Sequence, residues 1–256
     1  MIELRGIVKK FSAFAVVNNV SFTVNHGEVL GYLGPNGAGK TTTIRMLAGL
    51  LEPSKGEILF EGRDIRDDIY AYKKRLGYIP EQSEIYPHLS AYDYLVMVGR
   101  LRRLPERPLK AKIIEFLSIF GLEQDMHGPI SSYSKGMRQK VLIAAALLHD
   151  PDILLLDEPL SGLDVTTGLI IRDLIQKLAK ENKIIIYSSH VLEVTEQVCS
   201  RIIILHQGNI VANDSVENLR SLMNLPSLTE IFSQLIVHED TGLAAERIVD
   251  AMKWNG

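Results

Sequence analysis

The sequence lacks the marks of a secreted, membrane-spanning or strongly charged protein. Its one cysteine, Cys199, cannot form a disulfide within the chain, which is typical of a reducing compartment. Its longest apolar run, Val141–Leu148, is far shorter than the roughly 20 residues that cross a bilayer, and its first residues contain no signal peptide. The 28 basic and 31 acidic residues give a formal net charge of −3, which argues against binding to nucleic acid. We therefore expect a soluble, intracellular protein that does not bind nucleic acid.

No internal repeat or low-complexity segment is present either, and 256 residues suit one large domain or one domain with an additional lobe. Alternating apolar and polar residues predict antiparallel strands within residues 1–33. Helical spacing follows in residues 86–130, and residues 202–205 and 209–212 predict a closing hairpin. The chain from residue 214 onward is interpreted as mixed helix and loop.

A glycine-rich segment follows the apolar strand that is predicted at residues 28–33. Glycines at 34, 37 and 39 let the backbone curl, so that successive N–H groups converge on phosphate oxygens at the start of the next helix. The Lys40 ammonium would reach the β- and γ-phosphates, and the Thr41 hydroxyl would bind Mg²⁺. The sequence therefore predicts a phosphate cradle made of Gly34, Pro35, Asn36, Gly37, Ala38, Gly39, Lys40, Thr41 and Thr42.

Two later apolar strands are predicted to end in polar residues. The strand at residues 153–156 delivers two adjacent carboxylates, Asp157 and Glu158, and buried carboxylates need a functional reason. Beside a phosphate cradle, Asp157 would hold Mg²⁺ and Glu158 would orient or deprotonate the attacking water. The strand at residues 183–189 ends at His190, which could reach a terminal phosphate.

Some residues carry weaker signals with two interpretations each. Phe11 could stack on adenine, but alone it is better explained as a residue of the β lobe. Ser134 precedes the helix predicted at residues 141–148 and could bind an anion, although an N-cap is the simpler explanation. His190, taken alone, is an ordinary strand end. A basic cluster forms either a solvated face, which we favour, or a surface for another subunit: Arg100, Arg102, Arg103, Arg107, Lys110 and Lys112.

In this order, the motifs resemble those of the nucleotide-binding subunit of an ATP-binding-cassette (ABC) transporter, over about residues 1–212. The correspondence covers Gly34–Thr41 as Walker A, Ile153–Glu158 as Walker B, Ser161–Asp164 as the D-loop, Tyr133–Met137 as the signature (LSGGQ in the family), Phe11 as the adenine-stacking aromatic and His190 as the switch histidine. Several motifs in one order are far more specific than any one of them.

The resemblance implies an α/β fold of the P-loop NTPase (RecA-like) class. Its core sheet would carry an N-terminal antiparallel β lobe and an inserted helical subdomain at about residues 86–148. Residues 1–212 would form the ABC ATPase domain, and residues 213–256 a C-terminal tail of mixed helix and loop.

The resemblance also implies a reaction, namely the hydrolysis of ATP with Mg²⁺, in which Glu158, His190 and Lys40 act. Two cassettes, a homodimer or a paired cassette, would close head to tail on ATP, with Ser134 and Gly136 of one subunit on the γ-phosphate held by the other. The closing dimer would drive a separate integral membrane permease from the cytoplasmic face of the cell membrane. Nucleotide contacts would also come from Phe11 and Gln82, and the Mg²⁺ ligands would be Thr41, Asp157 and Gln82.

Two departures from the family pattern affect these expectations. Glu81 occupies the position of the usual loop glutamine and Gln82 follows it, so either residue could supply the metal and coupling contact. The signature keeps its serine and second glycine but has Lys135 and Met137 in place of the first glycine and the glutamine. That variant resembles bacterial subunits that serve separate permeases, many of them exporters, so export is the expected direction.

Two other functions compete with this one. A soluble cassette ATPase acting on ribosomes or nucleic acid would commonly carry two cassettes, a coiled coil or a zinc insertion, and this chain has one cassette, one cysteine and no heptad run. A simple P-loop kinase would leave the signature and His190 unexplained.

Overall fold

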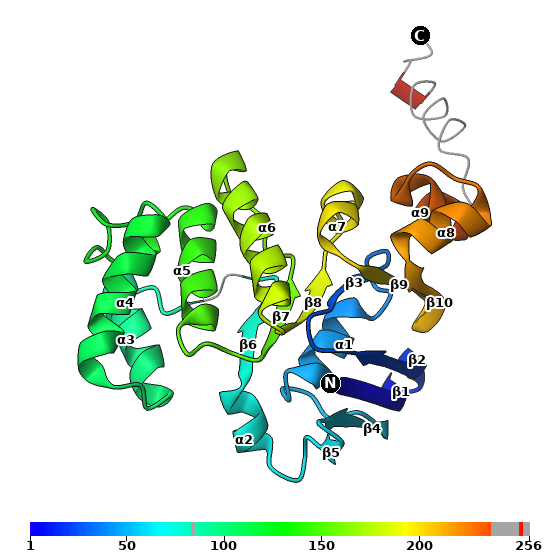
Figure 1. The fold of residues 1–256 in the computed structure, drawn as a ribbon, viewed down its shortest axis with the longest axis horizontal. Helices are drawn as coiled ribbons and strands as arrows, with labels where there is room; N and C mark the ends of the chain where they lie inside the picture. The colour runs from blue at the N-terminus through cyan, green and yellow to red at the C-terminus, as the bar shows by residue number, and fades with distance from the viewer. Residues whose placement is uncertain (83–84, 237–250, 253–256) are drawn as a thin grey trace.

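The computed structural model describes residues 1–82, 85–236 and 251–252, and it contains two sheets (Figure 1). The six-stranded sheet has the order β10 (Asn209–Ser215), β9 (Arg201–His206), β3 (Val29–Leu33), β8 (Ile184–Ser188), β7 (Ile153–Asp157) and β6 (Leu76–Ile79), and it is parallel except for the β9–β10 hairpin. The four-stranded antiparallel sheet has the order β2 (Phe14–Val24), β1 (Ile2–Phe11), β4 (Lys55–Phe60) and β5 (Arg63–Asp64).

The central strands β3, β7 and β8 are buried along their whole length, as continuous apolar runs in a covered parallel sheet should be. Alternate side chains enter two different cores. Leu30, Leu155 and Ile186 pack with α1 and the β lobe, whereas Leu33 and Leu154 pack with the helices on the other face. All three strands run the same way, so their carboxyl ends meet at one edge of the sheet.

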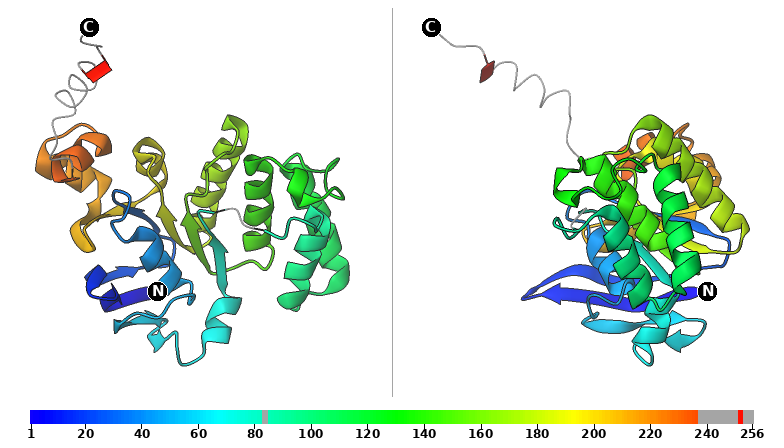
Figure 2. Two further views of the ribbon diagram at one scale, coloured as in Figure 1. Left: turned by 180° about the vertical axis from the view of Figure 1, so that it is seen from behind. Right: turned by 90° about the vertical axis from the view of Figure 1, so that its left-hand side faces the viewer.

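Nine α-helices lie within the described residues, and Figures 1 and 2 show three of them, α3, α4 and α5, gathered at one end of the molecule. Their bounds are α1 (Lys40–Leu47), α2 (Ile69–Lys74), α3 (Ala91–Leu101), α4 (Glu106–Ile119), α5 (Lys135–Leu147), α6 (Val165–Lys180), α7 (Leu192–Val198), α8 (Val216–Met223) and α9 (Leu228–Ile236). None of the helices in this part of the chain combines the length and apolar character needed to cross a membrane.

Several predicted boundaries were wrong by a few residues. Helix α5 begins at Lys135, not at Val141, because Ser134 caps it and the first turn needs no apolar residue. The closing hairpin continues to Ser215. Beyond it, α8 buries Leu219 and α9 buries Leu228 and Ile231 in the main core. Residues 237–250 and 253–256 of the expected tail lie outside the described residues.

Three residues of the basic cluster, Arg100, Arg102 and Lys110, form polar contacts within the chain. Glu106 forms ion pairs with Arg100 at 2.5 Å and with Lys110 at 3.5 Å. The half-buried Arg102 guanidinium donates to the backbone carbonyls of Lys73 and Leu76, which ties α3 to the start of β6. These contacts support the interpretation of the cluster as an ordinary structural and solvated face.

Candidate nucleotide-binding site

A polar cavity of about 290 Å³ lies at the carboxyl edge of the parallel sheet. Its walls come from residues that follow β3 and β6 and from the end of β7. The carboxyl ends of strands are where α/β folds usually bind ligands. Its lining consists of Val16, Asn36, Gly37, Gly39, Lys40, Thr41, Thr42, Glu81, Asp157 and Glu158. The structure thus brings most of the predicted cradle together with both predicted carboxylates.

The cradle opens onto helix α1 in a way that favours an anion. The first N–H groups of an α-helix have no partner within the helix, and at α1 the N-cap is Gly39, which has φ 106° and no side chain to bond to them. A Cβ atom at Gly39 would lie 2.6 Å from the carbonyl oxygen of Val16 and would push the β lobe away. Unpaired N–H groups at a helix start form a phosphate site.

Lys40 crosses the cradle from the first position of α1. Its Nζ donates to the carbonyl oxygens of Gly34 at 2.6 Å and Pro35 at 3.1 Å. Burial lowers the pKa of Lys40, and the carboxylates of Glu158, Asp157 and Glu81 oppose that change. The ammonium therefore sits between the loop that would hold the phosphates and the carboxylates on the other side.

Asp157 ends strand β7 with a carboxylate that is 1% exposed. Its Oδ2 has no hydrogen-bond partner within the described residues. Burial raises the pKa of this carboxyl group, the nearby hydroxyls of Ser188 and Thr41 oppose that change, and the carboxylates of Glu81 and Glu158 raise the pKa further. A buried carboxylate oxygen without a donor is costly unless a cation compensates it.

Glu158 is held in place by the end of strand β8. His190 Nδ1 lies 2.8 Å from Glu158 Oε1, and the Ser189 hydroxyl donates to Oε2 over 3.2 Å. The backbone of Glu158 has φ +51°, a rare value for a residue with a side chain, and its N–H donates to the carbonyl oxygen of Ser188. Backbone strain and two side-chain contacts fix the carboxylate at the cavity edge. Sequence reasoning missed Ser189, whose place directly before His190 was the available signal.

The two candidates for the loop-glutamine position lie differently. The Thr41 hydroxyl donates to Glu81 Oε2 over 3.5 Å, and Glu81 lines the phosphate cavity. Gln82 is not among the residues that line this cavity, and both Gln82 and Glu81 line a neighbouring hollow of about 630 Å³ whose walls also include Lys135 and His190. The following residues, 83–84, lie outside the described residues.

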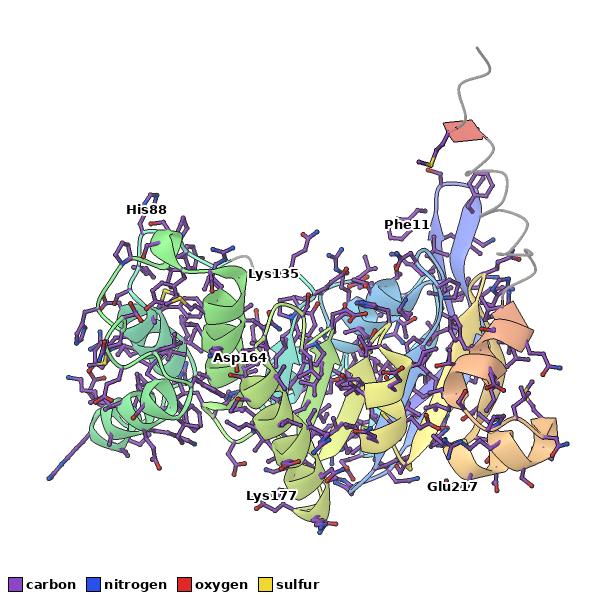
Figure 3. The ribbon with its side chains drawn as sticks, turned by 90° about the horizontal axis from the view of Figure 1, so that it is seen from above. Phe11, His88, Lys135, Asp164, Lys177 and Glu217 are labelled. Carbon is purple, nitrogen blue, oxygen red and sulfur yellow. The ribbon has the colours of Figure 1, made fainter. Side chains whose placement is uncertain are left out.

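Phe11 is not part of the phosphate cavity. It ends β1, opposite Phe14, and its side chain is half exposed on the hairpin that stands beside the cradle (Figure 3). The Lys9 ammonium lies 5.4 Å from the centre of its ring. The β-lobe residue that does line the cavity is Val16, which the sequence did not single out.

Ser134 and Gly136 are not among the residues that line this cavity. The Ser134 hydroxyl accepts a 3.2 Å hydrogen bond from the Met137 N–H, so the predicted N-cap is confirmed. Gly136 lies against the backbone of Gly162, where a Cβ atom would be 2.4 Å from the carbonyl oxygen. The signature serine is therefore an exposed helix cap that does not line the phosphate cavity of its own chain.

Comparisons with known proteins identify the family of this chain. A family model described as "ABC transporter" matches residues 17–161. The ABC transporter ATP-binding protein NatA of Bacillus subtilis is 41% identical over 242 residues, which are 93% of this chain and 98% of NatA. The solved structure of an ATP-binding subunit of an ABC transporter has 31% identity and a TM-score of 0.86, and the match covers 92% of this chain and 99% of that one.

A second solved structure represents a later stage of the reaction. It is a dimeric post-hydrolysis state of the ATP-binding cassette MJ0796 bound to ADP and Pi, with 25% identity and a TM-score of 0.78 over 84% of this chain and 99% of that one. This chain belongs to the ABC transporter family, and it is an ATP-binding cassette that hydrolyses ATP.

The raised pKa of Asp157 leads to a stability prediction. A carboxyl group whose pKa is raised in the folded state destabilises the fold once the pH exceeds that pKa, and it costs nothing below the pKa of the unfolded chain. We expect Asp157→Asn to raise the Tm of the nucleotide-free protein at pH 7 by about 2–4 °C, the change that corresponds to about 1 kcal/mol at this size.

The measurement is thermal unfolding of both proteins from pH 7 down to pH 4. The gain should shrink as the pH falls, because the wild-type carboxyl group becomes neutral as well. A variant that is less stable than the wild type at pH 7 would show that the unpaired Oδ2 is not a cost.

Proposed function

We propose that this chain powers transport, with export as the direction, through a separate membrane permease, and that its ATP lies between two cassettes. The observation that carries the catalytic part is the placement of Glu158, which His190 and Ser189 hold at the edge of the phosphate cavity. A fixed carboxylate beside a phosphate cradle can orient water for attack on a γ-phosphate.

In the proposed reaction the N–H groups at the start of α1 and the Lys40 ammonium bind the phosphate oxygens. Lys40 would leave the carbonyl oxygens of Gly34 and Pro35 for the phosphates, a stronger and charge-assisted interaction. Glu158 orients the attacking water and accepts its proton, while His190 keeps the Glu158 carboxylate in place and faces the terminal phosphate.

The residues at the cavity edge fit Mg²⁺, which prefers oxygen ligands and is usually bound by one or two carboxylates together with phosphates. The unpartnered Oδ2 of Asp157 and the hydroxyl of Thr41 are such ligands. We propose Glu81, not Gln82, as the third protein group, because Glu81 contacts Thr41 within the same cavity. The bound ion would neutralise charge on the phosphates.

A second copy of the chain would complete the site. Ser134 and Gly136 lie at the exposed start of α5, away from their own cradle, where they could meet a γ-phosphate that a partner holds. The MJ0796 dimer bound to ADP and Pi supports pairing of such cassettes. Phe11, exposed on the β1–β2 hairpin, would stack on adenine outside the phosphate cavity.

The proposed location is the cytoplasmic face of the cell membrane, on an integral membrane permease. Export is favoured by the sequence Tyr133–Met137, which resembles that of bacterial subunits that serve separate exporters.

Glu158→Gln tests the catalytic assignment. Glutamine keeps the shape of the side chain but cannot accept the proton, so we expect ATP binding to persist and kcat to fall by about 10²–10⁴-fold. Steady-state phosphate release and equilibrium binding of ATP measure the two effects. Turnover within a few-fold of the wild type would remove Glu158 from the proposed role.

Glu81→Gln tests the proposed metal ligand, with Gln82→Ala as the matched control next to it. We measure ATP binding at increasing Mg²⁺ concentration in the Glu158→Gln background, where hydrolysis does not interfere. Loss of the Glu81 charge should raise the Mg²⁺ concentration at half-saturation by about tenfold, a typical effect of altering a group around a metal, and Gln82→Ala should leave it unchanged. The reverse result would assign the contact to Gln82.

The transport role is tested by purifying the tagged chain from native membranes with and without ATP. We expect one polytopic membrane protein to accompany it in proportion, and the tag alone to recover none. Inside-out vesicles that carry the complex should then accumulate its cargo when ATP is added outside. Recovery of ribosomes or nucleic-acid complexes without a membrane partner would point to the soluble cassette alternative.

A further inference from the structure

The first turn of α5 is joined to the D-loop, Ser161–Asp164, at close range. Lys135 Nζ donates to the hydroxyl of Ser161 over 2.7 Å. The stem of Lys135 also covers Gly162, where a Cβ atom would lie 3.1 Å from two of the lysine carbons. On the neighbouring residue, Gly136, there is no room for a side chain against the Gly162 carbonyl. The backbones of α5 and the D-loop are thus in direct contact at Gly136 and Gly162, and the Lys135 side chain packs over this contact.

Two more residues of α5 hold the two ends of the β7–α6 loop, residues 158–164, which contains the D-loop. The buried amide of Gln139 donates to the carbonyl oxygen of Pro159 over 3.0 Å, and Lys140 Nζ forms a 3.0 Å ion pair with Asp164, the N-cap of α6 (Figure 3 labels Lys135 and Asp164). The loop is therefore attached to α5 at its start, middle and end, so that α5 and the loop should move together.

The loop leads directly to the catalytic carboxylate. The Ser161 N–H donates to the carbonyl oxygen of Glu158 over 3.1 Å, and Pro159 lies between them with its φ fixed by the ring. Glu158 is already held at a strained φ of +51°. A shift of Ser161 is therefore transmitted to the backbone that positions the Glu158 side chain.

The presence of a lysine at position 135 is not explained by the stability of helix α5. It occupies the first position of α5, where a positive charge opposes the helix dipole, and the first turn of α5 contains no acidic residue. A glycine at this position, as in the LSGGQ pattern, could not reach Ser161. Lys135 and Ser161 also share the 630 Å³ hollow with Glu158 and His190, which places the contact beside the catalytic pair.

We propose that Lys135 is a positioning residue that couples the signature to Glu158 of the same subunit. The inference rests on the proposed dimer, in which Ser134 and Gly136 meet the ATP held by the partner. When α5 moves as it binds the partner's ATP, the Lys135–Ser161 hydrogen bond moves Ser161 with it. The shift of Ser161 then positions the Glu158 carboxylate next to the ATP bound by its own subunit. Binding at one site thereby promotes hydrolysis at the other.

The test compares Lys135→Met, Ser161→Ala and the double variant in steady-state hydrolysis and in ATP binding. Each single change should lower kcat by about three- to tenfold, leave the affinity of the monomer for ATP unchanged and reduce the Hill coefficient towards 1. The double variant should lose no more than the larger single loss, because both changes break one contact. Lys135→Arg should keep most of the wild-type rate, and the control Lys110→Met, the same change on α4, should keep all of it.

A second readout uses the monomer without ATP. Amide exchange at Ser161 and Leu163, whose N–H groups donate within the loop, should speed up in Lys135→Met and not in Lys135→Arg. Additive losses in kcat, or unchanged exchange, would overturn the proposal.

A third readout separates this inference from the proposed function. ATP-dependent dimerisation in the Glu158→Gln background should be retained by both single variants. If Lys135→Met alone weakens it, Lys135 contacts the partner's nucleotide directly and the proposed coupling is wrong. If the Glu158→Gln protein itself never dimerises, the proposed dimer fails, and the coupling fails with it even where the exchange result holds.

Discussion

The site depends on how charge is balanced at one edge of the parallel sheet. Three carboxylates, those of Glu81, Asp157 and Glu158, share a cavity with one ammonium, that of Lys40. Burial disfavours the charged forms of both Asp157 and Lys40, so in the nucleotide-free protein both charges reduce the stability of the fold. Phosphates next to the cradle and a cation next to Asp157 would relieve both costs at once, which explains why the fold tolerates this arrangement.

The convergence of these groups follows from the order of the strands. β3 leads into the cradle, β7 ends at Asp157, and β8 beside it supplies the groups that hold Glu158. From Glu158 the chain continues into the loop that α5 holds through Lys135, Gln139 and Lys140. One connection between the helical subdomain and the phosphate cavity therefore runs through Glu158, whose backbone has a φ of +51°.

The sequence predicted the central strands and their polar ends because continuous apolar runs and glycine-rich turns are local signals. The apolar pattern placed the helix at residues 141–148, whereas the capping bond of Ser134, which residue type alone suggested, marks its start at Lys135. The sequence could not choose between Glu81 and Gln82, because adjacent residues at a strand end point in different directions that only the fold defines. The Lys135–Ser161 contact joins residues 26 positions apart and has no local signal at all.

In the proposed function, ATP binds between two copies of the chain and Glu158 acts in its hydrolysis. The most direct measurement is the mass of the Glu158→Gln protein in solution by light scattering, with ATP and with ADP. We expect a mass of about twice the 28.6 kDa of one chain with ATP, and the mass of one chain with ADP. Adding Lys40→Ala or Ser134→Ala should abolish the dimer. A protein that binds ATP to saturation and stays at the mass of one chain would contradict this proposal.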